Sequence, residues 1–297
     1  MKVLLLGHDG WIGQKIQPLL TAKRIEYIVT GLRGEDVKLQ KFITENLVTH
    51  VYCCLGRTHG TIDDTLYTTI DYLEHKETLH QNINDDLYVP LSLSLFCDKQ
   101  IIHFTYIGTG CIFNDERPSN NEENLPNFSG SNYSIVKGFT DMRMAQTNSL
   151  ILRIRMPVSS DRNARNFISK ITTYDKICST PNSMTVLDEL LPLSLEKMKN
   201  CTVGCYNFTN PGVITHNQIL KMYKEIVDPD FVWTNMTLQV QDTILLSKRS
   251  TNKLNTDKLE AYYHLNSIHT AVRNSLKIMA AHDSELRAAD GIQNIIV

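Results

Sequence analysis

Two residues one helical turn apart, Tyr133 and Lys137, carry side chains that could together deliver a proton. Residues four positions apart share a helix face, so we expect the lysine charge to lower the tyrosine pKa from about 10 towards neutrality. A phenol tuned in this way could protonate a carbonyl oxygen while a hydride arrives at the carbon. Thr109, at the end of an expected strand, could hold the same oxygen through its hydroxyl. These residue types predict reduction of a ketone.

Cys111 lies two residues beyond Thr109, and simple ketone reduction requires no thiol. Each candidate also has an ordinary structural explanation. A tyrosine and a lysine four apart occur by chance on many helices, and cysteine is often a small buried hydrophobe. Their occurrence together, with a cofactor loop at the same end of the expected sheet, favours a catalytic role.

A glycine-spaced loop, Gly7-x-x-Gly10-x-x-Gly13, follows the first expected strand and opens the first expected helix. Backbone N–H groups at a helix N-terminus can face a pyrophosphate. A tight strand-to-helix turn is the alternative, but the strand before it, the helix after it and the downstream Tyr–Lys pair favour dinucleotide binding. We expect Leu55 and Gly56, at the end of a later strand, to pass beneath the adenine and ribose.

Arg33 lies near the end of the second expected strand, where an NAD enzyme usually offers an acidic residue to the ribose. A guanidinium there suits the extra phosphate of NADPH through paired hydrogen bonds, so NADPH is the expected cofactor. The alternative is a solvated loop charge near Glu35 and Asp36. The expected cofactor-binding residues are Gly7, Gly10, Trp11, Ile12, Gly13, Arg33, Leu55, Gly56, Tyr133, Lys137 and Pro157.

Short apolar runs alternate with helical stretches along the first half of the chain. Between the first two runs, Ile12, Ile16, Leu19 and Leu20 fit one face of a helix. This alternation predicts an α/β fold with a doubly wound parallel sheet. The expected strands are Lys2–Leu6, Tyr27–Thr30, Val51–Leu55, Ile101–Ile107 and Leu150–Arg155.

The second half of the chain has a looser pattern, which predicts a smaller and discontinuous substrate-binding lobe. We expect residues 1–157 and 183–205 to form the cofactor-binding Rossmann domain and residues 158–182 and 206–282 to form this lobe. Ligands of such sheets bind beyond the carboxyl ends of the strands, where the loops of both parts meet. For the tail, residues 283–297, a docking helix and disorder are both open.

Composition excludes several classes of function. The formal net charge of the 297 residues is −2 and no run of lysine and arginine exceeds a pair, so we expect neither nucleic-acid nor membrane binding. The first apolar run, Val3 to Leu6, is too short for a signal-peptide core, and we expect a soluble cytoplasmic protein. Seven cysteines without a CxxC pair predict reduced thiols and no metal site.

The glycine loop and the Tyr133/Lys137 pair resemble those of the extended short-chain dehydrogenase/reductases, which act on nucleotide sugars. Further segments make the chain closely resemble the nucleotide-rhamnose synthase/epimerase-reductase family, from residue 1 to about 280. These segments are Thr109-Gly-Cys-Ile-Phe113, residues 155–170, residues 181–191 and Tyr206-Asn-Phe-Thr-Asn-Pro-Gly212. The resemblance implies conversion of UDP-4-keto-6-deoxy-D-glucose to UDP-L-rhamnose, by 3,5-epimerisation and NADPH-dependent 4-reduction in one active site.

The resemblance also implies roles for five residues. Thr109, Tyr133 and Lys137 match the reductase triad of the family, and Cys111 and Lys170 match its epimerisation acid/base pair. Which of the last two removes a proton and which returns it is open. Both need a lowered pKa, because a free thiol has a pKa of about 8.5 and a free lysine one of about 10.4. Polar loop residues expected to hold the sugar or diphosphate are Ser159, Ser160, Arg165 and Asn166.

Two other functions are compatible with the sequence. One is a 4-keto-reductase alone, similar to dTDP-4-dehydrorhamnose reductases, and Cys111 and Lys170 argue against it. The other is a non-catalytic nucleotide-binding subunit, and the intact Tyr–Lys pair argues against that. The expected partner is a nucleotide-sugar substrate. A homodimer with a second copy of the chain is also compatible with the sequence.

Overall fold

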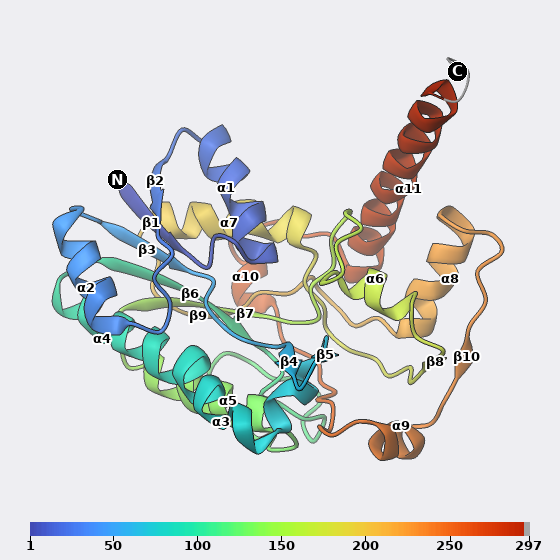
Figure 1. Cartoon of the computed structure of the whole chain (residues 1–297), viewed down its shortest axis with the longest axis horizontal. Helices are drawn as coiled ribbons and strands as arrows, with labels where there is room; N and C mark the ends of the chain where they lie inside the picture. Colours follow the sequence, from blue (N-terminus) through green and yellow to red (C-terminus); the bar gives the residue numbers. More distant parts are fainter. Residues whose placement is uncertain (294–297) are drawn as a thin grey trace.

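The computed structural model describes residues 1–293 and is built around a six-stranded parallel sheet (Figure 1). The strand order is β2, β1, β3, β6, β7, β9, which confirms the predicted doubly wound sheet. Five strands match the predicted runs to within two residues at each end, and the sixth, β9, was not predicted. The strands are β1 (Lys2–Leu6), β2 (Glu26–Val29), β3 (His50–Cys53), β6 (His103–Thr109), β7 (Ser149–Ile154) and β9 (Gly204–Asn207).

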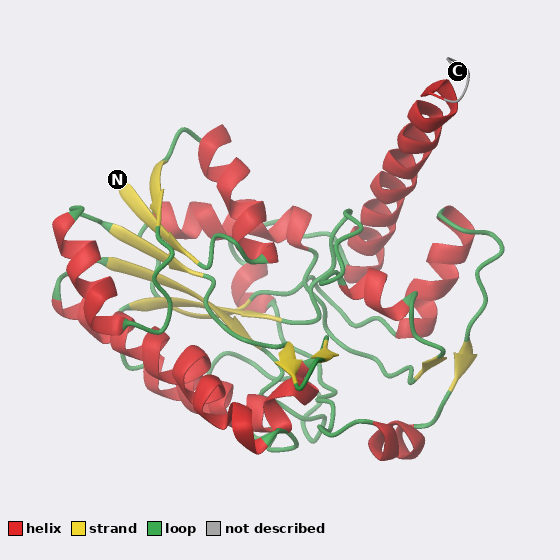
Figure 2. Cartoon of the chain, viewed as in Figure 1, coloured by secondary structure: helices red, strands yellow, loops and turns green. Residues whose placement is uncertain are grey.

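Helices cover both faces of this sheet (Figure 2), as strands with two buried faces require. Alternate residues of β1 show the division. Val3 and Leu5 pack in one hydrophobic cluster, whereas Leu4 and Leu6 pack in another. The first layer contains α1 (Trp11–Ala22) and α7 (Leu187–Lys199), and the opposite layer contains α2 (Asp36–Glu45), α4 (Val89–Lys99) and α5 (Asn132–Met144).

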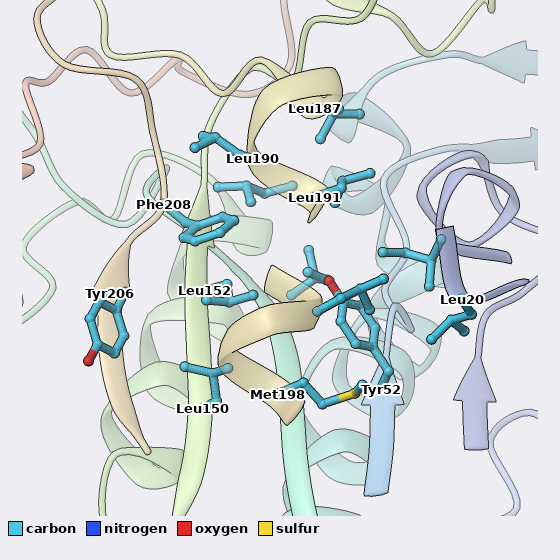
Figure 3. Packing of buried hydrophobic residues seen from close by; sticks show 14 of the residues in the cluster. Leu20, Tyr52, Leu150, Leu152, Leu187, Leu190, Leu191, Met198, Tyr206 and Phe208 are labelled. Carbon is cyan, nitrogen blue, oxygen red and sulfur yellow. The ribbon is translucent and has the colours of Figure 1, made fainter. Parts of the chain in front are cut away.

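Helix α7 shows how the first layer is built (Figure 3). Two of its leucines, Leu187 and Leu190, are fully buried with Leu152 of β7. The hydroxyl of Tyr52 lies in the same layer and bonds the Ser194 hydroxyl at 2.6 Å, so the polar tip of this side chain is satisfied. This packing fixes the carboxyl edge of the sheet.

A crevice is expected at that edge where β1 lies between β2 and β3. Helix α1, which follows β1, lies on one face of the sheet, and α2, which follows β2, lies on the opposite face. The helical connections therefore change faces next to β1, which is the switch point of the sheet. Gly7 follows β1 at this point, and Leu55 and Gly56 follow β3. The fold therefore brings the predicted cofactor loop to the switch point.

The second half of the chain builds a smaller cluster beside the sheet. Buried residues such as Ile168, Ile219 and Val272 form its core. Its elements are α6 (Phe167–Ile171), α8 (His216–Ile226), α9 (Leu238–Ile244), α11 (Ile268–Gln293) and a two-stranded parallel sheet of β8 (Lys176–Ile177) and β10 (Thr234–Asn235). Residues Leu259 and Leu265, near α10 (Asp257–Glu260), pack instead with the main sheet.

The chain between β3 and α4 is made of short elements near the crevice. They are a hairpin of β4 (Gly60–Ile62) and β5 (Thr65–Tyr67), 3₁₀ turns at Ile70–Glu74 and Lys76–Thr78, α3 (Leu79–Ile83) and a π-helical turn at Asn84–Tyr88.

Helix α11 continues through most of the segment predicted as a tail, to Gln293. The remaining residues of that prediction, 294–297, lie outside the described part of the chain. Among residues 1–293, no helix combines the length and the apolar character that crossing a membrane requires.

Candidate active site

The glycine loop after β1 is packed too closely for side chains at two of its three glycines. Gly7 has a φ of +73°, and a Cβ there would lie 3.0 Å from the carbonyl carbon of Cys54. A Cβ on Gly13 would lie 2.1 Å from the carbonyl oxygen of Gly7. Gly10 is the N-terminal cap of α1 and contributes no side-chain hydrogen bond. The loop therefore offers bare backbone at a helix N-terminus, which fits a pyrophosphate.

One cavity of about 390 Å³ at the carboxyl edge collects most of the predicted site residues. A second cavity, of about 600 Å³, shares Cys111 and Arg155 with the first and extends to β8 and α9. The first cavity is lined by Gly7, Gly10, Trp11, Ile12, Gly13, Leu55, Gly56 and Pro157 of the cofactor set and by Thr109, Cys111, Tyr133, Lys137, Arg165 and Lys170.

Tyr133 is buried near the start of α5, against Tyr72 and Leu73 from the 3₁₀ turn. Burial raises the pKa of its phenol, while Lys137 and a hydrogen bond with Thr109 act in the lowering direction. The prediction that Lys137 brings this pKa towards neutrality is therefore wrong for the protein alone, since loss of hydration outweighs the lysine charge. The phenol is protonated at neutral pH, as a proton donor must be.

Lys137 is buried one turn further along α5, and its ammonium group contacts residues other than Tyr133. It bonds the Tyr106 hydroxyl and lies 3.6 Å from Oδ1 of Asp86. The Nζ atom is also 4.5 Å from the centroid of the Tyr106 ring. The lysine is thus held by β6 and by the π-helical turn, beside Gly56.

Cys111 is half-buried after β6, and its sulfur contacts a guanidinium group. Nη1 of Arg155 lies 3.4 Å from Sγ. Arg155 is fully buried, and its other partners are oxygen atoms of uncharged groups, including the carbonyl of Gly110 at 3.3 Å and the hydroxyl of Ser250 at 3.0 Å. The cationic neighbour of the sulfur is therefore Arg155.

Lys170 lies on α6 and reaches the opposite lobe, where Nζ donates to the carbonyl of Thr68 at 3.2 Å. Burial and the nearby charges of Arg165 and Arg249 lower the pKa of Lys170 to about 8. Lys170 therefore has the lowered pKa that its expected role requires. Arg165 also bonds the Thr68 carbonyl, at 3.3 Å.

Arg33 lies outside the cavity lining, in the loop after β2. Its Nη2 atom is 3.2 Å from Oδ1 of Asp9, within the glycine loop, and its side chain is 52% exposed. The guanidinium is thus near the cofactor loop, and its contact with a phosphate stays a prediction.

The substrate-binding candidates Ser159, Ser160 and Asn166 also lie outside the cavity lining, and their hydrogen bonds go to their own loop, to α6 and to α7. Asn166 caps α6 by accepting from the Ile168 N–H at 3.2 Å. Both serines bond the Asp188 carboxylate, through a hydroxyl at 2.9 Å and a backbone N–H at 2.7 Å. These contacts shape the loop, and a role in holding the sugar stays a prediction for these residues.

Three charged residues of the cavity lining, Asp86, Arg155 and Arg249, were not predicted. Asp86 and Arg155 contact Lys137 and Cys111, and Arg249 pairs with Asp71 at 3.0 Å. The available signal was strongest for Arg155, a charged residue that ends the predicted strand Leu150–Arg155. Asp86 and Arg249 are brought in by segments without a recognisable motif.

Comparison with known proteins identifies the fold class of the chain. None of the protein-family models searched matches the chain. A dTDP-4-dehydrorhamnose reductase structure from Clostridium acetobutylicum has a TM-score of 0.78 at 18% identity, covering 94% of this chain and 99% of that one. At this identity the likeness shows the fold alone, which is that of the Rossmann-type reductases and epimerases.

Closer relatives define the family. Protein L780 of Acanthamoeba polyphaga mimivirus is 43% identical over 272 residues, 89% of this chain and 93% of the relative. Its crystal structure, described as a UDP-rhamnose synthase, has a TM-score of 0.90 and covers 94% of this chain and 99% of that one. A bifunctional dTDP-4-dehydrorhamnose 3,5-epimerase/reductase of Arabidopsis thaliana is 38% identical over 272 residues, 88% of this chain and 87% of the relative.

The chain therefore belongs to the nucleotide-rhamnose 3,5-epimerase/4-reductase family, which confirms the resemblance seen in the sequence. It is an enzyme of the epimerase-reductase type, with a cavity that combines the expected reductase and epimerase residues.

Proposed function

We propose that this enzyme converts UDP-4-keto-6-deoxy-D-glucose to UDP-L-rhamnose with NADPH. The observation that carries the proposal is the single cavity into which Tyr133, Cys111 and Lys170 all project. The preference for a UDP sugar follows the likeness to the mimivirus UDP-rhamnose synthase. The pyrophosphate of NADPH fits the glycine loop, because the loop offers bare backbone at the N-terminus of α1.

The cofactor-binding residues surround the reductase residues. The glycine loop would hold the pyrophosphate, Arg33 would contact the additional phosphate, and Lys137 would hold the nicotinamide ribose. NADPH bound there supplies the hydride for carbon 4 of the sugar. Tyr133 donates the proton to oxygen 4, and its burial keeps the phenol protonated until then.

Epimerisation precedes reduction and uses the same ketone. The carbonyl at carbon 4 acidifies the hydrogens on carbons 3 and 5, so a base can remove each and leave an enolate. Thr109 and Tyr133 stabilise the enolate oxygen. A proton returned to the opposite face of the ring inverts the carbon.

The acid/base pair consists of Cys111 and Lys170, which come from different lobes. A thiol accepts a carbon-bound proton only as the thiolate, and Arg155 places a positive charge against that sulfur. The lowered pKa of Lys170, about 8, allows the amine to exchange protons near neutral pH.

The proposal is tested with the keto sugar and NADPH in deuterated water, followed by mass spectrometry. Wild-type protein is expected to form UDP-rhamnose carrying deuterium at carbons 3 and 5. Cys111→Ala is expected to lose deuterium incorporation and product, whereas the control Cys201→Ala, which removes an exposed thiol, keeps both. If Cys111→Ala still converts the unepimerised keto sugar to UDP-rhamnose, Cys111 is not an epimerisation residue. If wild-type protein reduces the keto sugar without incorporating deuterium at carbons 3 and 5, the enzyme is a reductase alone.

We also propose that the enzyme acts in the cytoplasm. All seven cysteines of the chain are free, including the exposed Cys201. Free thiols in this number are typical of proteins in a reducing compartment. The cytoplasm is such a compartment, and there the Cys111 thiol of the active site stays reduced.

A further inference from the structure

The orientation of Lys137 requires an explanation that the Tyr–Lys spacing does not give. Its ammonium group is buried and directed to Tyr106 and Asp86, on β6 and on the π-helical turn. A buried ammonium needs a partner that offsets the loss of hydration. Among the described residues, Asp86 is the carboxylate that pairs with it.

Asp86 is a fully buried carboxylate in the lining of the catalytic cavity. Oδ1 accepts from the backbone N–H of Arg57 at 3.2 Å, and the backbone carbonyl of Asp86 accepts from the Thr140 hydroxyl at 2.7 Å. A Cβ on Gly56 would lie 3.1 Å from Oδ1, so the cofactor-side loop closes directly over the carboxylate. The π-helical turn is thus anchored on both sides and presents one charge to Lys137.

The same carboxylate acts on the proton donor. The negative charge of Asp86 raises the pKa of Tyr133, in opposition to Lys137. An asparagine at residue 86 could accept the same hydrogen bonds, so these bonds alone do not explain why the residue is an aspartate. The aspartate differs from an asparagine in its negative charge.

We propose that Asp86 is a positioning residue for the reductase step: its carboxylate fixes the Lys137 ammonium and offsets its charge, so that Tyr133 remains a protonated donor. This inference rests on the proposed function, because it assigns a role in ketone reduction. Asp86 acts through Lys137 and Tyr133 and need not touch the sugar.

Other charged and titratable groups face the pair from each neighbouring element. Burial raises the pKa of Asp86 to about 6, and Lys137 opposes this rise. Asp85 acts on Asp86 in the raising direction and is itself paired with Arg57, Nε to Oδ2, at 2.6 Å. The remaining groups are Cys53 of β3, Tyr106 of β6, Cys111 after β6 and Tyr133 of α5.

The test compares Asp86→Asn with the matched control Asp85→Asn, which neutralises the adjacent carboxylate that pairs with Arg57. The readout is the pH profile of ketone reduction, measured as NADPH oxidation with an epimerised keto sugar. Without the Asp86 charge, Lys137 stabilises the Tyr133 phenolate more strongly. The fall in the reduction rate at alkaline pH, where the phenol loses its proton, is therefore expected to move to lower pH by about one unit. Asp85→Asn is expected to lose activity at the same alkaline pH as the wild-type protein.

A second readout needs neither cofactor nor substrate. Infrared difference spectra of the wild-type protein alone are expected to show a buried carboxyl group that protonates as the pH falls through about 6. The band is expected to be absent in Asp86→Asn and present in Asp85→Asn. This measurement on the wild-type protein keeps the inference testable if Asp86→Asn fails to fold.

The outcomes separate the inference from the proposed function. If wild-type protein does not reduce the ketone, the proposed function fails. If wild-type protein is active but the limb of Asp86→Asn is unmoved, or moves equally in Asp85→Asn, the role of Asp86 is overturned. Absence of a carboxyl group titrating near pH 6 in wild-type protein also overturns it.

Discussion

The phenol of Tyr133 is subject to opposing influences that the sequence does not reveal together. The spacing to Lys137 is visible in the sequence, whereas the burial against Tyr72 and Leu73 depends on a segment about 60 residues earlier in the chain. Desolvation favours the neutral phenol more than the lysine charge favours the phenolate. The identity of the donor could therefore be predicted, but not the direction of its pKa shift.

Tyr133→Phe removes the proton donor while leaving Cys111 and Lys170 in place. We expect ketone reduction to fall by a factor of about 10²–10⁴, the range for loss of a general acid. Some deuterium exchange at carbons 3 and 5 is expected to remain, because the acid/base pair is intact. Mass spectrometry in deuterated water measures both, with the exposed Tyr262→Phe as control. Normal NADPH turnover by Tyr133→Phe would contradict the role of the phenol.

The buried ammonium group of Lys170 is expected to lower the free energy of unfolding, although catalysis requires it. Its folded pKa of about 8 lies below the ordinary value of 10.5, so the unfolded chain binds more protons between these values. The cost of the buried charge is complete below pH 8 and disappears above about 10.5.

Lys170→Met is therefore expected to abolish exchange at carbons 3 and 5 and to raise the unfolding temperature at pH 7. A rise of about 2–4 °C corresponds to about 1 kcal/mol for a chain of comparable size. Thermal unfolding at pH 7 and pH 11 checks this, since the difference from wild type should shrink at the higher pH. A lower unfolding temperature for Lys170→Met at pH 7 argues against this account.

At the scale of elements, the parallel strands and the glycine loop could be predicted because their signals are local. The strand β9 was missed, since its four residues, Gly204-Cys-Tyr-Asn207, begin with glycine and lack an apolar run. It pairs with β7, Leu150 beside Gly204, so its place in the sheet depends on a neighbour that the sequence does not identify. The polar loop before α6 was equally ambiguous, because an asparagine that caps a helix and one that binds a sugar look alike in sequence.

Gly13→Ala tests the packing between the glycine loop and helix α1. The added Cβ meets backbone atoms, 2.1 Å from the Gly7 oxygen and 2.7 Å from Cα of His8, so the loop must move. We expect a loss of about 1–3 kcal/mol in the free energy of unfolding and weakened NADPH binding. The comparison is Gly10→Ala, whose Cβ would lie 3.3 Å from the Gly7 oxygen at a normal φ of −75°.

Chemical denaturation and NADPH fluorescence measure the two effects. Gly10→Ala is expected to keep nearly the wild-type free energy of unfolding. Equal stability of Gly13→Ala and Gly10→Ala would show that the loop tolerates a side chain at residue 13, contrary to the geometry.

At the scale of the whole molecule, contacts between the two halves enclose the catalytic cavity. Arg165 and Lys170 of the smaller half bond the Thr68 carbonyl, and Arg249 pairs with Asp71 at 3.0 Å. Leu259, from the second half of the chain, packs into the main sheet. Contacts of this kind join segments more than 90 residues apart, which explains why sequence motifs did not predict them.

Cofactor binding is expected to stabilise the molecule in a way that depends on Arg33. At 100 times its dissociation constant NADPH adds about 2.7 kcal/mol, which raises the unfolding temperature by about 5 °C or more. Arg33→Ala is expected to reduce the NADPH shift to that given by an equal concentration of NADH. Thermal unfolding with each cofactor measures this, with the exposed Arg143→Ala as control. An unchanged preference in Arg33→Ala would mean that another group recognises the phosphate.

Asp161 connects the cofactor helix to the loop that leads into α6. Its Oδ2 atom accepts from the indole N–H of Trp11 at 3.1 Å and lies 2.6 Å from Nζ of Lys15, and both of these residues belong to α1. Since α1 begins at the pyrophosphate loop, anything that displaces this helix also displaces the residues preceding Arg165 and Lys170. Displacement of α1 by a bound cofactor would therefore reach this loop, and by thermodynamic reciprocity any resulting change in sugar affinity would equal the change in cofactor affinity on sugar binding.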